Sequence, residues 1–230
     1  MRRLLAAVVA CLLATGPTMA MAQQFTGKRA EVRLGADLNG ADLWEAYDYI
    51  DGYYRMNDER RFHSAEAGFS YGLGLGYDIP LSGRVVAGVE ATLDFSTAKT
   101  CTSDFYQWED FCLKAGRDIG LGIRAGAVVA PGTLLFVKAG YASGRIKMTG
   151  RDLLWGGTLS EGKSRDGLRI GGGLEAALSR RLYLKAEYSY TDYSNWQDRF
   201  EQVEQWLRFR QEARLDFDRH KMLAVVGARF

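Results

Sequence analysis

Two histidines are the candidate catalytic bases of this chain of 230 residues, since an imidazole titrates near neutral pH. They are His63 and His220. His63 is followed by Ser64 and then by Glu66, a set that could activate a hydroxyl nucleophile. On a strand, however, adjacent residues point to opposite faces, which would separate His63 from Ser64. The sequence therefore gives little support for a serine nucleophile.

Two further patterns that could do chemistry are weaker. Asp216 and Asp218 share alternate positions with His220, but carboxylates beside a surface histidine are common by chance. Residues 120–125 match the dinucleotide-binding pattern G-x-G-x-x-A letter by letter, yet they lie inside a strand-like run with no helix after it. We therefore predict that the protein is not an enzyme and holds no cofactor.

The chain has three cysteines, and two of them are expected to form a disulfide. Cys11 lies in an N-terminal segment that we expect to be removed, whereas Cys101 and Cys112 share one polar segment. An oxidising compartment favours a bond between them, and closing so short a loop would contribute roughly 3 kcal/mol. Two free thiols are the alternative. A metal site is disfavoured because no Cys-x-x-Cys spacing or histidine cluster accompanies the pair.

The first 22 residues have the form of a secretory signal peptide. A pair of arginines precedes an apolar stretch over 4–14, and Ala-Met-Ala at 20–22 resembles a cleavage site. The apolar stretch is too short to span a bilayer as a helix. Lipoprotein cleavage before Cys11 is the alternative. We expect export through the general secretory route and a mature domain over 23–230.

The composition excludes several classes of protein. Lys and Arg total 30 against 28 Asp and Glu, and two of the arginines fall in the signal segment, so the mature chain is no nucleic-acid binder. With 47% hydrophobic and 25% charged residues, it is neither disordered nor a polytopic helical membrane protein. Abundant glycine (27), scarce proline (3) and 12% aromatic residues favour strands.

Apolar and polar residues alternate with a period of two, as in strands with two different faces. The alternation defines eight runs, at 30–38, 65–79, 85–95, 119–129, 135–141, 168–178, 182–190 and 222–230. Short turns at 80–83, 130–132 and 179–181 alternate with long polar segments at 40–64, 96–116, 146–165 and 194–212. Such connections are typical of outer-membrane barrels. We predict an all-β fold, an eight-stranded antiparallel transmembrane β-barrel with short periplasmic turns and four long extracellular loops.

The polar positions of these runs carry charges of both signs, which suits a narrow lumen filled by hydrogen-bonded ion pairs. The predicted lumen residues are Glu31, Arg33, Glu66, Glu90, Asp94, Asp118, Arg124, Lys138, Arg169, Glu175, Lys185 and Glu187. Tyrosines near strand ends, such as Tyr77, Tyr141 and Tyr188, fit the aromatic girdles of a membrane barrel. Both features favour the membrane barrel over a soluble lipocalin-like barrel or sandwich, the alternative fold.

Segments 171–175 and 184–192, together with the C-terminal strand 218–230, resemble the opacity-protein-like, porin-related family of Gram-negative outer-membrane barrels, whose eight-stranded barrels are of the OmpA type. The resemblance covers the strands and none of the four long connections. It implies an outer-membrane location. It also implies that Phe230 is the signal read by the outer-membrane assembly machinery, with periplasmic chaperones as further partners, although Ala228 is smaller than the aromatic residue often found there.

Aromatic residues in the first and fourth long connections are candidate contacts with an extracellular ligand or a host surface. They are Trp44, Tyr47, Tyr49, Tyr53, Tyr54 and Trp206. The alternative is that they pack on one another or on lipopolysaccharide.

The predicted function is that of a structural, surface-exposed outer-membrane protein surrounded by membrane lipid and lipopolysaccharide. An eight-stranded barrel is just wide enough for side chains to fill it, so we expect a lumen closed by ion pairs. A small porin-like channel for ions or small solutes is the alternative.

Overall fold

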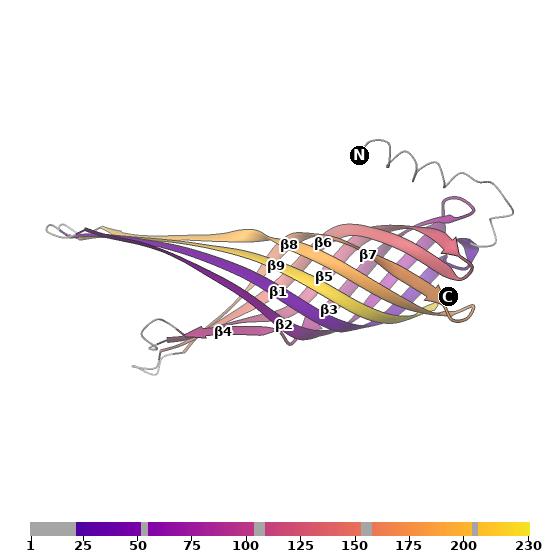
Figure 1. Cartoon of the computed structure of the whole chain (residues 1–230), viewed down its shortest axis with the longest axis horizontal. Helices are drawn as coiled ribbons and strands as arrows, with labels where there is room; N and C mark the ends of the chain where they lie inside the picture. The colour runs from indigo at the N-terminus through magenta and orange to yellow at the C-terminus, as the bar shows by residue number, and fades with distance from the viewer. Residues whose placement is uncertain (1–21, 52–54, 104–108, 153–157, 204–206) are drawn as a thin grey trace.

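The computed structural model describes residues 22–51, 55–103, 109–152, 158–203 and 207–230. Nine strands follow one another: β1 (Gly27–Asp51), β2 (Arg55–Pro80), β3 (Val85–Ser96), β4 (Lys99–Ser103), β5 (Glu109–Ala130), β6 (Thr133–Asp152), β7 (Thr158–Ala177), β8 (Leu182–Val203) and β9 (Leu207–Arg229). β3 and β4 lie one after the other along the same edge of β5, so the two together count as one strand of the barrel wall. The described chain is thus the predicted eight-stranded antiparallel barrel (Figure 1).

The barrel closes through the two ends of the chain. The first strand, β1, pairs with the last, β9, from Arg29↔Arg229 upward. β3 pairs with β5, which completes the ring. Closure leaves no free backbone edge within the membrane, where an unpaired N–H or C=O group would be costly. No helix in the described residues is long and apolar enough to cross a membrane.

The short connections all lie at one end of the barrel, together with the start of β1 and the end of β9 (Figure 1). They join β2 to β3, β5 to β6 and β7 to β8. In an outer-membrane barrel this end faces the periplasm.

The long connections at the other end differ from the prediction, because most of their length is paired strand rather than loop. β1 and β2 stay in register up to Ile50↔Arg55. β8 and β9 remain paired up to Val203↔Arg208, with one register shift between Tyr193 and Trp196. Figure 1 shows these four strands projecting beyond the barrel as a long blade. Ten residues of strand span about 33 Å. Apolar and polar residues are mixed on both alternate sets of positions in these segments, so the sequence did not mark them as strands. The tips at 52–54, 104–108, 153–157 and 204–206 lie outside the described residues.

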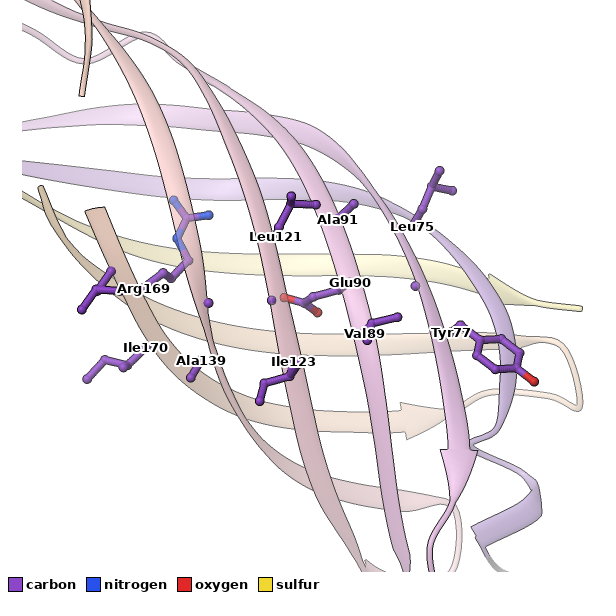
Figure 2. Close-up of a pocket in the computed structure, with 14 residues that line it drawn as sticks. Leu75, Tyr77, Val89, Glu90, Ala91, Leu121, Ile123, Ala139, Arg169 and Ile170 are labelled. Carbon is purple, nitrogen blue, oxygen red and sulfur yellow. The ribbon is translucent and has the colours of Figure 1, made fainter. Parts of the chain in front are cut away.

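Apolar side chains face outward along the barrel wall and polar ones face inward. Leu73, Leu121, Ile123, Val137, Leu168 and Ile170 are 59–73% exposed in the isolated chain. Figure 2 shows outward-facing side chains from neighbouring strands, among them Leu75, Leu121 and Ile123. This orientation is the reverse of a lipocalin-like barrel, whose apolar residues line the inside. The outer surface is therefore built to contact lipid.

Aromatic rings collect on the outer surface towards the extracellular end. Tyr71 stacks on Phe95 with ring centroids 5.6 Å apart, and on Phe69 at 6.3 Å. Tyr141 is also exposed on this surface, at 47%. These rings form part of the interfacial girdle that the sequence predicts.

Candidate functional site

The lumen of the barrel is filled by charged side chains. Among the described residues, nine basic and eight acidic side chains are buried there. The basic set is Arg29, Arg33, Arg124, Lys138, Arg169, Lys185, Arg219, Lys221 and Arg229, and the acidic set is Glu31, Asp37, Asp78, Glu90, Asp94, Asp118, Glu175 and Glu187. The signs nearly balance, as burial of so many ions requires.

The layer nearest the periplasm is centred on Asp78 and Glu175. Arg124 binds Asp78 with two hydrogen bonds, Nε to Oδ1 at 2.8 Å and Nη2 to Oδ2 at 2.6 Å. Its third nitrogen, Nη1, donates to Glu175 at 3.0 Å. Arg229 from the last strand also reaches both carboxylates, with 3.1 Å from Nη1 to Asp78. Arg29 Nε also lies 3.1 Å from Asp78 Oδ2, so Asp78 is shared by three guanidinium groups and Glu175 by two.

The central layer is centred on Glu31 and Glu187. Lys185 Nζ lies 2.9 Å from both Glu31 oxygens and 3.0 Å from Glu187 Oε2. Arg33 Nη2 donates to Glu187 at 2.8 Å, and Lys138 Nζ lies 2.6 Å from the same carboxylate. Tyr183 donates its hydroxyl to Glu31 at 2.7 Å. These contacts join strands on different sides of the barrel.

The layer nearest the cell surface is centred on Asp118. Its Oδ2 accepts hydrogen bonds from Lys221 at 2.6 Å and from Arg169 at 2.5 Å. Lys221 also contacts Asp94 at 3.0 Å, and Arg219 forms an ion pair with Asp37. The three layers form one continuous network. Arg33 bonds to Asp94 at 3.0 Å as well as to the central layer, and Arg29 contacts both Asp78 and Glu31.

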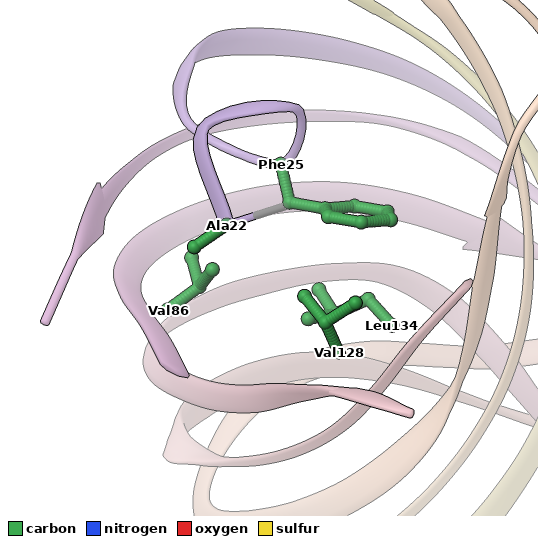
Figure 3. Packing of buried hydrophobic residues seen from close by; sticks show 5 residues of the cluster. All are labelled: Ala22, Phe25, Val86, Val128 and Leu134. Atoms are coloured by element: carbon green, nitrogen blue, oxygen red, sulfur yellow. The ribbon is translucent and has the colours of Figure 1, made fainter. Parts of the chain in front are cut away.

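An apolar cluster lies below the network, at the periplasmic end. It contains Ala22, Phe25, Val86, Val128 and Leu134, all at most 6% exposed (Figure 3). The chain before β1 turns into the barrel mouth and places the Phe25 ring there. Arg229 ties this turn to the network, since its Nη1 donates to the Phe25 backbone oxygen at 2.6 Å.

A second apolar cluster lies above the network, at the extracellular end of the lumen. Ala41, Ala142, Tyr193 and Phe217 are each at most 9% exposed, and the Tyr193 and Phe217 ring centroids are 5.5 Å apart. The charged network is therefore enclosed between two apolar clusters.

Glycines on the inner wall make room for the rings that fill the lumen. A Cβ atom at Gly227 would lie 2.2 Å from Cζ of Tyr183, and one at Gly144 would lie 2.8 Å from the Tyr193 hydroxyl. Neither contact is sterically allowed, so the two tyrosines need bare backbone opposite them.

The structure brings eleven of the twelve predicted lumen residues together, and the side chain of Glu66 lies outside the described residues. The prediction omitted six charged groups that complete the network: Arg29, Asp37, Asp78, Arg219, Lys221 and Arg229. All six occupy polar positions in the period-two pattern of their strands, so this pattern could have identified them as lumen residues.

The disulfide between Cys101 and Cys112 is present, and it joins residues that face each other directly in the β4–β5 register. Their Cα atoms are 4.1 Å apart. The bond holds β4 against β5 above the membrane-spanning wall.

The two histidines lie apart on the outer surface. His63 Nδ1 contacts Asp42 at 2.5 Å, while the side chain of Ser64 lies outside the described residues. His220 contacts the Tyr188 hydroxyl at 2.7 Å and Asp218 at 3.5 Å. Residues 120–125 lie within β5, so the backbone of the glycine motif is paired strand with no phosphate-binding turn.

Of the predicted loop contacts, Trp44 is described and lies on the blade. Its indole donates to Glu59, which also accepts a hydrogen bond from Arg61 at 3.2 Å. These two hydrogen bonds, with that from Trp44 the stronger, lower the pKa of the Glu59 carboxyl. Arg214, which pairs with Trp44 on β9, lies over the Trp44 ring with its Cζ atom 5.1 Å from the ring centroid. The side chains of Tyr47, Tyr49, Tyr53, Tyr54 and Trp206 lie outside the described residues.

Phe230, the predicted assembly signal, follows the last strand and is 79% exposed. Its backbone N–H donates to the Lys28 oxygen at 2.9 Å, so the final residue is held in the sheet while its ring remains accessible.

Comparison with known proteins decides the family. The family model described as "Outer membrane protein beta-barrel domain" matches residues 8–230. The chain belongs to this outer-membrane β-barrel family. Its location is accordingly the outer membrane of a Gram-negative bacterium.

The chain is similar to the 25 kDa outer-membrane immunogenic protein of Brucella canis, with 32% identity over 112 residues. The match covers 49% of this chain and 46% of the relative, so it spans less than half of that protein's length. Among solved structures, outer membrane protease OmpT from Escherichia coli is 7% identical, with a TM-score of 0.50 over 89% of this chain and 97% of the other. OprG from Pseudomonas aeruginosa is 11% identical, with a TM-score of 0.49 over the same shares. The OmpT likeness concerns the fold alone.

Proposed function

We propose that this barrel is a structural, surface-exposed component of the outer membrane whose lumen is closed to solutes. The observation that carries the proposal is the enclosure of a paired charge network between two apolar clusters. A channel would need ion pairs such as Arg33–Glu187, at 2.8 Å, to separate although both side chains are buried. That cost supports a static filling of the lumen rather than a conducting state, and the same reasoning favours a protein without enzymatic activity inside the barrel.

The blade formed by the outer parts of β1, β2, β8 and β9 is the proposed contact surface for extracellular ligands or host surfaces. It carries exposed polar and charged groups on described positions such as Asp42, Glu59, Arg61 and Asp216. Its outer strands leave the closed barrel, because β2 pairs with β3 only from Ser70 onward along the wall. The projecting sheet is thus the part of the chain farthest from the lipid.

A deletion experiment separates this function from a porin function. Loss of a closed structural barrel should weaken the envelope, so the deletion strain should leak periplasmic enzyme and become sensitive to detergent. Loss of a porin should instead slow uptake of small solutes. Complementation with a variant lacking residues 43–62 should restore envelope integrity without restoring surface contacts. Reduced solute uptake with an intact envelope would contradict the proposal.

We also propose that residues 1–22 are removed during export, which leaves Phe25, Val86, Val128 and Leu134 as the periplasmic apolar cluster, and that the outer-membrane assembly machinery reads Phe230. Mass spectrometry of protein purified from outer membranes should give Gln23 as the first residue. A mass that includes lipidated Cys11 would contradict this cleavage.

A further inference from the structure

Five basic side chains form a compact group on the outer surface, which we call the outer basic cluster. They are Lys99 on β4, Lys114 and Arg117 on β5, and Arg145 and Lys147 on β6, all exposed. Lys99 pairs directly with Lys114, and Lys114 pairs directly with Lys147. Three ammonium groups therefore stand side by side on neighbouring strands.

A β-bulge adds the two arginines to this row. Ala115 pairs with Ile146 and Asp118 pairs with Gly144, so Gly116 and Arg117 together oppose the single residue Arg145. A bulge of this kind turns a side chain that regular pairing would place elsewhere. Arg117 and Arg145 therefore lie opposite each other on β5 and β6, closer to the membrane than the three lysines.

The cluster has no internal counter-charge among the described residues. No ion pair joins any of the five side chains to a described carboxylate. Asp166, the acid on the neighbouring strand β7, is engaged by the side chains of Tyr141 and Ser143. Like charges placed directly opposite each other destabilise a sheet. An anion from outside the chain would offset this repulsion.

The outer basic cluster lies just above the lipid-facing surface of the barrel, which limits the kind of anion that can reach it. The outward residues directly below it belong to the lipid-facing surface: Phe95, Ile119 and Tyr141 are 38%, 41% and 47% exposed. Arg117 is two residues above Ile119, a rise of about 7 Å. The five cations therefore lie at the level where the outer leaflet carries its headgroups.

An apolar depression of about 890 Å³ lies on the same strands, within the membrane-facing surface (Figure 2). Ala91 and Ala139 leave room between larger neighbours such as Leu75, Leu121 and Ile170, which also line it. Leu121 is four residues below Arg117 on β5, about 13 Å along the strand. A molecule with an anionic head and an acyl chain would fit both features at once.

The opposite side of the barrel carries the reverse charge. Asp42, Asp192 and Asp216 are exposed on β1, β8 and β9, where Asp42 pairs directly with Asp216. A phosphate would be repelled there and attracted to β4–β6. The charge pattern thus selects one side of the barrel.

We propose that the outer basic cluster and the depression bind one phosphorylated glycolipid of the outer leaflet, with its phosphates on the cluster and an acyl chain in the depression. The Cys101–Cys112 disulfide supports the site. Cys101 is two residues after Lys99 and Cys112 is two residues before Lys114, so the bond keeps the two lysines opposite each other. The inference goes beyond the closed lumen and stands whether or not the lumen conducts.

The test uses protein purified from outer membranes, stripped of lipid in neutral detergent, and titrated with fluorescent lipid A carrying both phosphates. The test variant is Lys99→Gln/Lys114→Gln/Lys147→Gln. The matched control is Arg84→Gln/Arg180→Gln/Arg181→Gln, which removes the same charge from exposed residues of the periplasmic turns. The cluster variant should lose roughly tenfold in affinity, equal to about 1.4 kcal/mol. The control should bind like the wild type, and lipid A without phosphates should bind the wild type as weakly as the cluster variant binds the phosphorylated form.

Equal affinity of the cluster variant and the control would overturn the proposal, as would equal binding of the two lipid A forms. Tight binding of a sulfated polysaccharide or of inorganic phosphate, with weak binding of lipid A, would also overturn it. Urea unfolding provides a second test in case the cluster variant assembles poorly. Phosphorylated lipid A should raise the unfolding midpoint of the wild type and of Ala139→Gly, but should raise that of Ala139→Trp, which fills the depression, much less. An equal rise for Ala139→Trp would contradict the acyl-chain position.

Discussion

Arg33 and Glu187 are separated by 154 residues in the sequence, yet the guanidinium of one donates to the carboxylate of the other at 2.8 Å. They lie on β1 and β8, which are not neighbours because β9 runs between them. The contact therefore crosses the lumen rather than following the wall. Contacts of this kind, between strands that are not neighbours in the wall, fill the interior of the barrel.

Glu187→Gln should destabilise the barrel by about 3–5 kcal/mol, because it removes the carboxylate that Arg33, Lys138 and Lys185 share and adds an unbalanced positive charge to the buried network. Asp192→Asn, on the outer face of the same strand, is the matched control and should change stability little. Urea unfolding in detergent measures both. A loss below 1 kcal/mol for Glu187→Gln would show that the network does not contribute as the distances indicate.

Leu121→Arg should impair assembly, because a lipid-facing arginine near the bilayer centre costs about 2–4 kcal/mol. Leu121 is 59% exposed on the outer wall. Ser194→Arg, at an exposed position beyond the membrane on β8, should assemble normally. The readout is the heat-modifiable shift of the folded barrel on a gel. Normal assembly of Leu121→Arg would reverse the assignment of inner and outer faces for β5.

Gly227→Ala should destabilise the barrel by about 1–3 kcal/mol, since overpacking forces neighbours to move. The new methyl group would fall within 2.2 Å of the Tyr183 ring. Adding Tyr183→Ala should make the glycine substitution nearly neutral, so a double-mutant cycle should show strong coupling. Additive effects of the two substitutions would mean that the ring is not held against Gly227.

The Trp44–Glu59 contact on the blade should respond to acid. The pKa of Glu59 is lowered in the folded protein, so the contact stabilises the folded blade above the ordinary carboxyl pKa and is lost as the pH falls through the lowered value. Trp44 emission, taken as the difference between wild type and Trp44→Phe, should change at that acidic pH. Glu59→Gln should abolish the transition. The same transition in Glu59→Gln would assign it to another group.

The fold was predictable from sequence because one physical rule governs every wall strand. Lipid on one side and a narrow lumen on the other force strict alternation, so runs such as 119–129 identify both the strands and their faces. Glu31 and Arg33 could be placed in the lumen from parity alone. The partner of each could not, because contacts such as Arg33–Glu187 depend on which strands close the ring.

The rest required three-dimensional register. Nothing in the sequence around Phe25 indicated that it fills the periplasmic mouth, since it precedes the first strand. The blade was not predicted because its sequence does not alternate between apolar and polar residues. The outer basic cluster was also invisible, since Lys99, Lys114 and Lys147 become neighbours only through the pairing of three strands.

The most direct test of the closed lumen is single-channel conductance of the protein in a planar bilayer. The protein should be purified from outer membranes and its folded state checked by heat-modifiable mobility. The network and its two apolar clusters predict a silent bilayer, with at most rare and irregular openings. A steady unitary conductance that scales with salt concentration would contradict the closed lumen and make the charged interior an ion pathway.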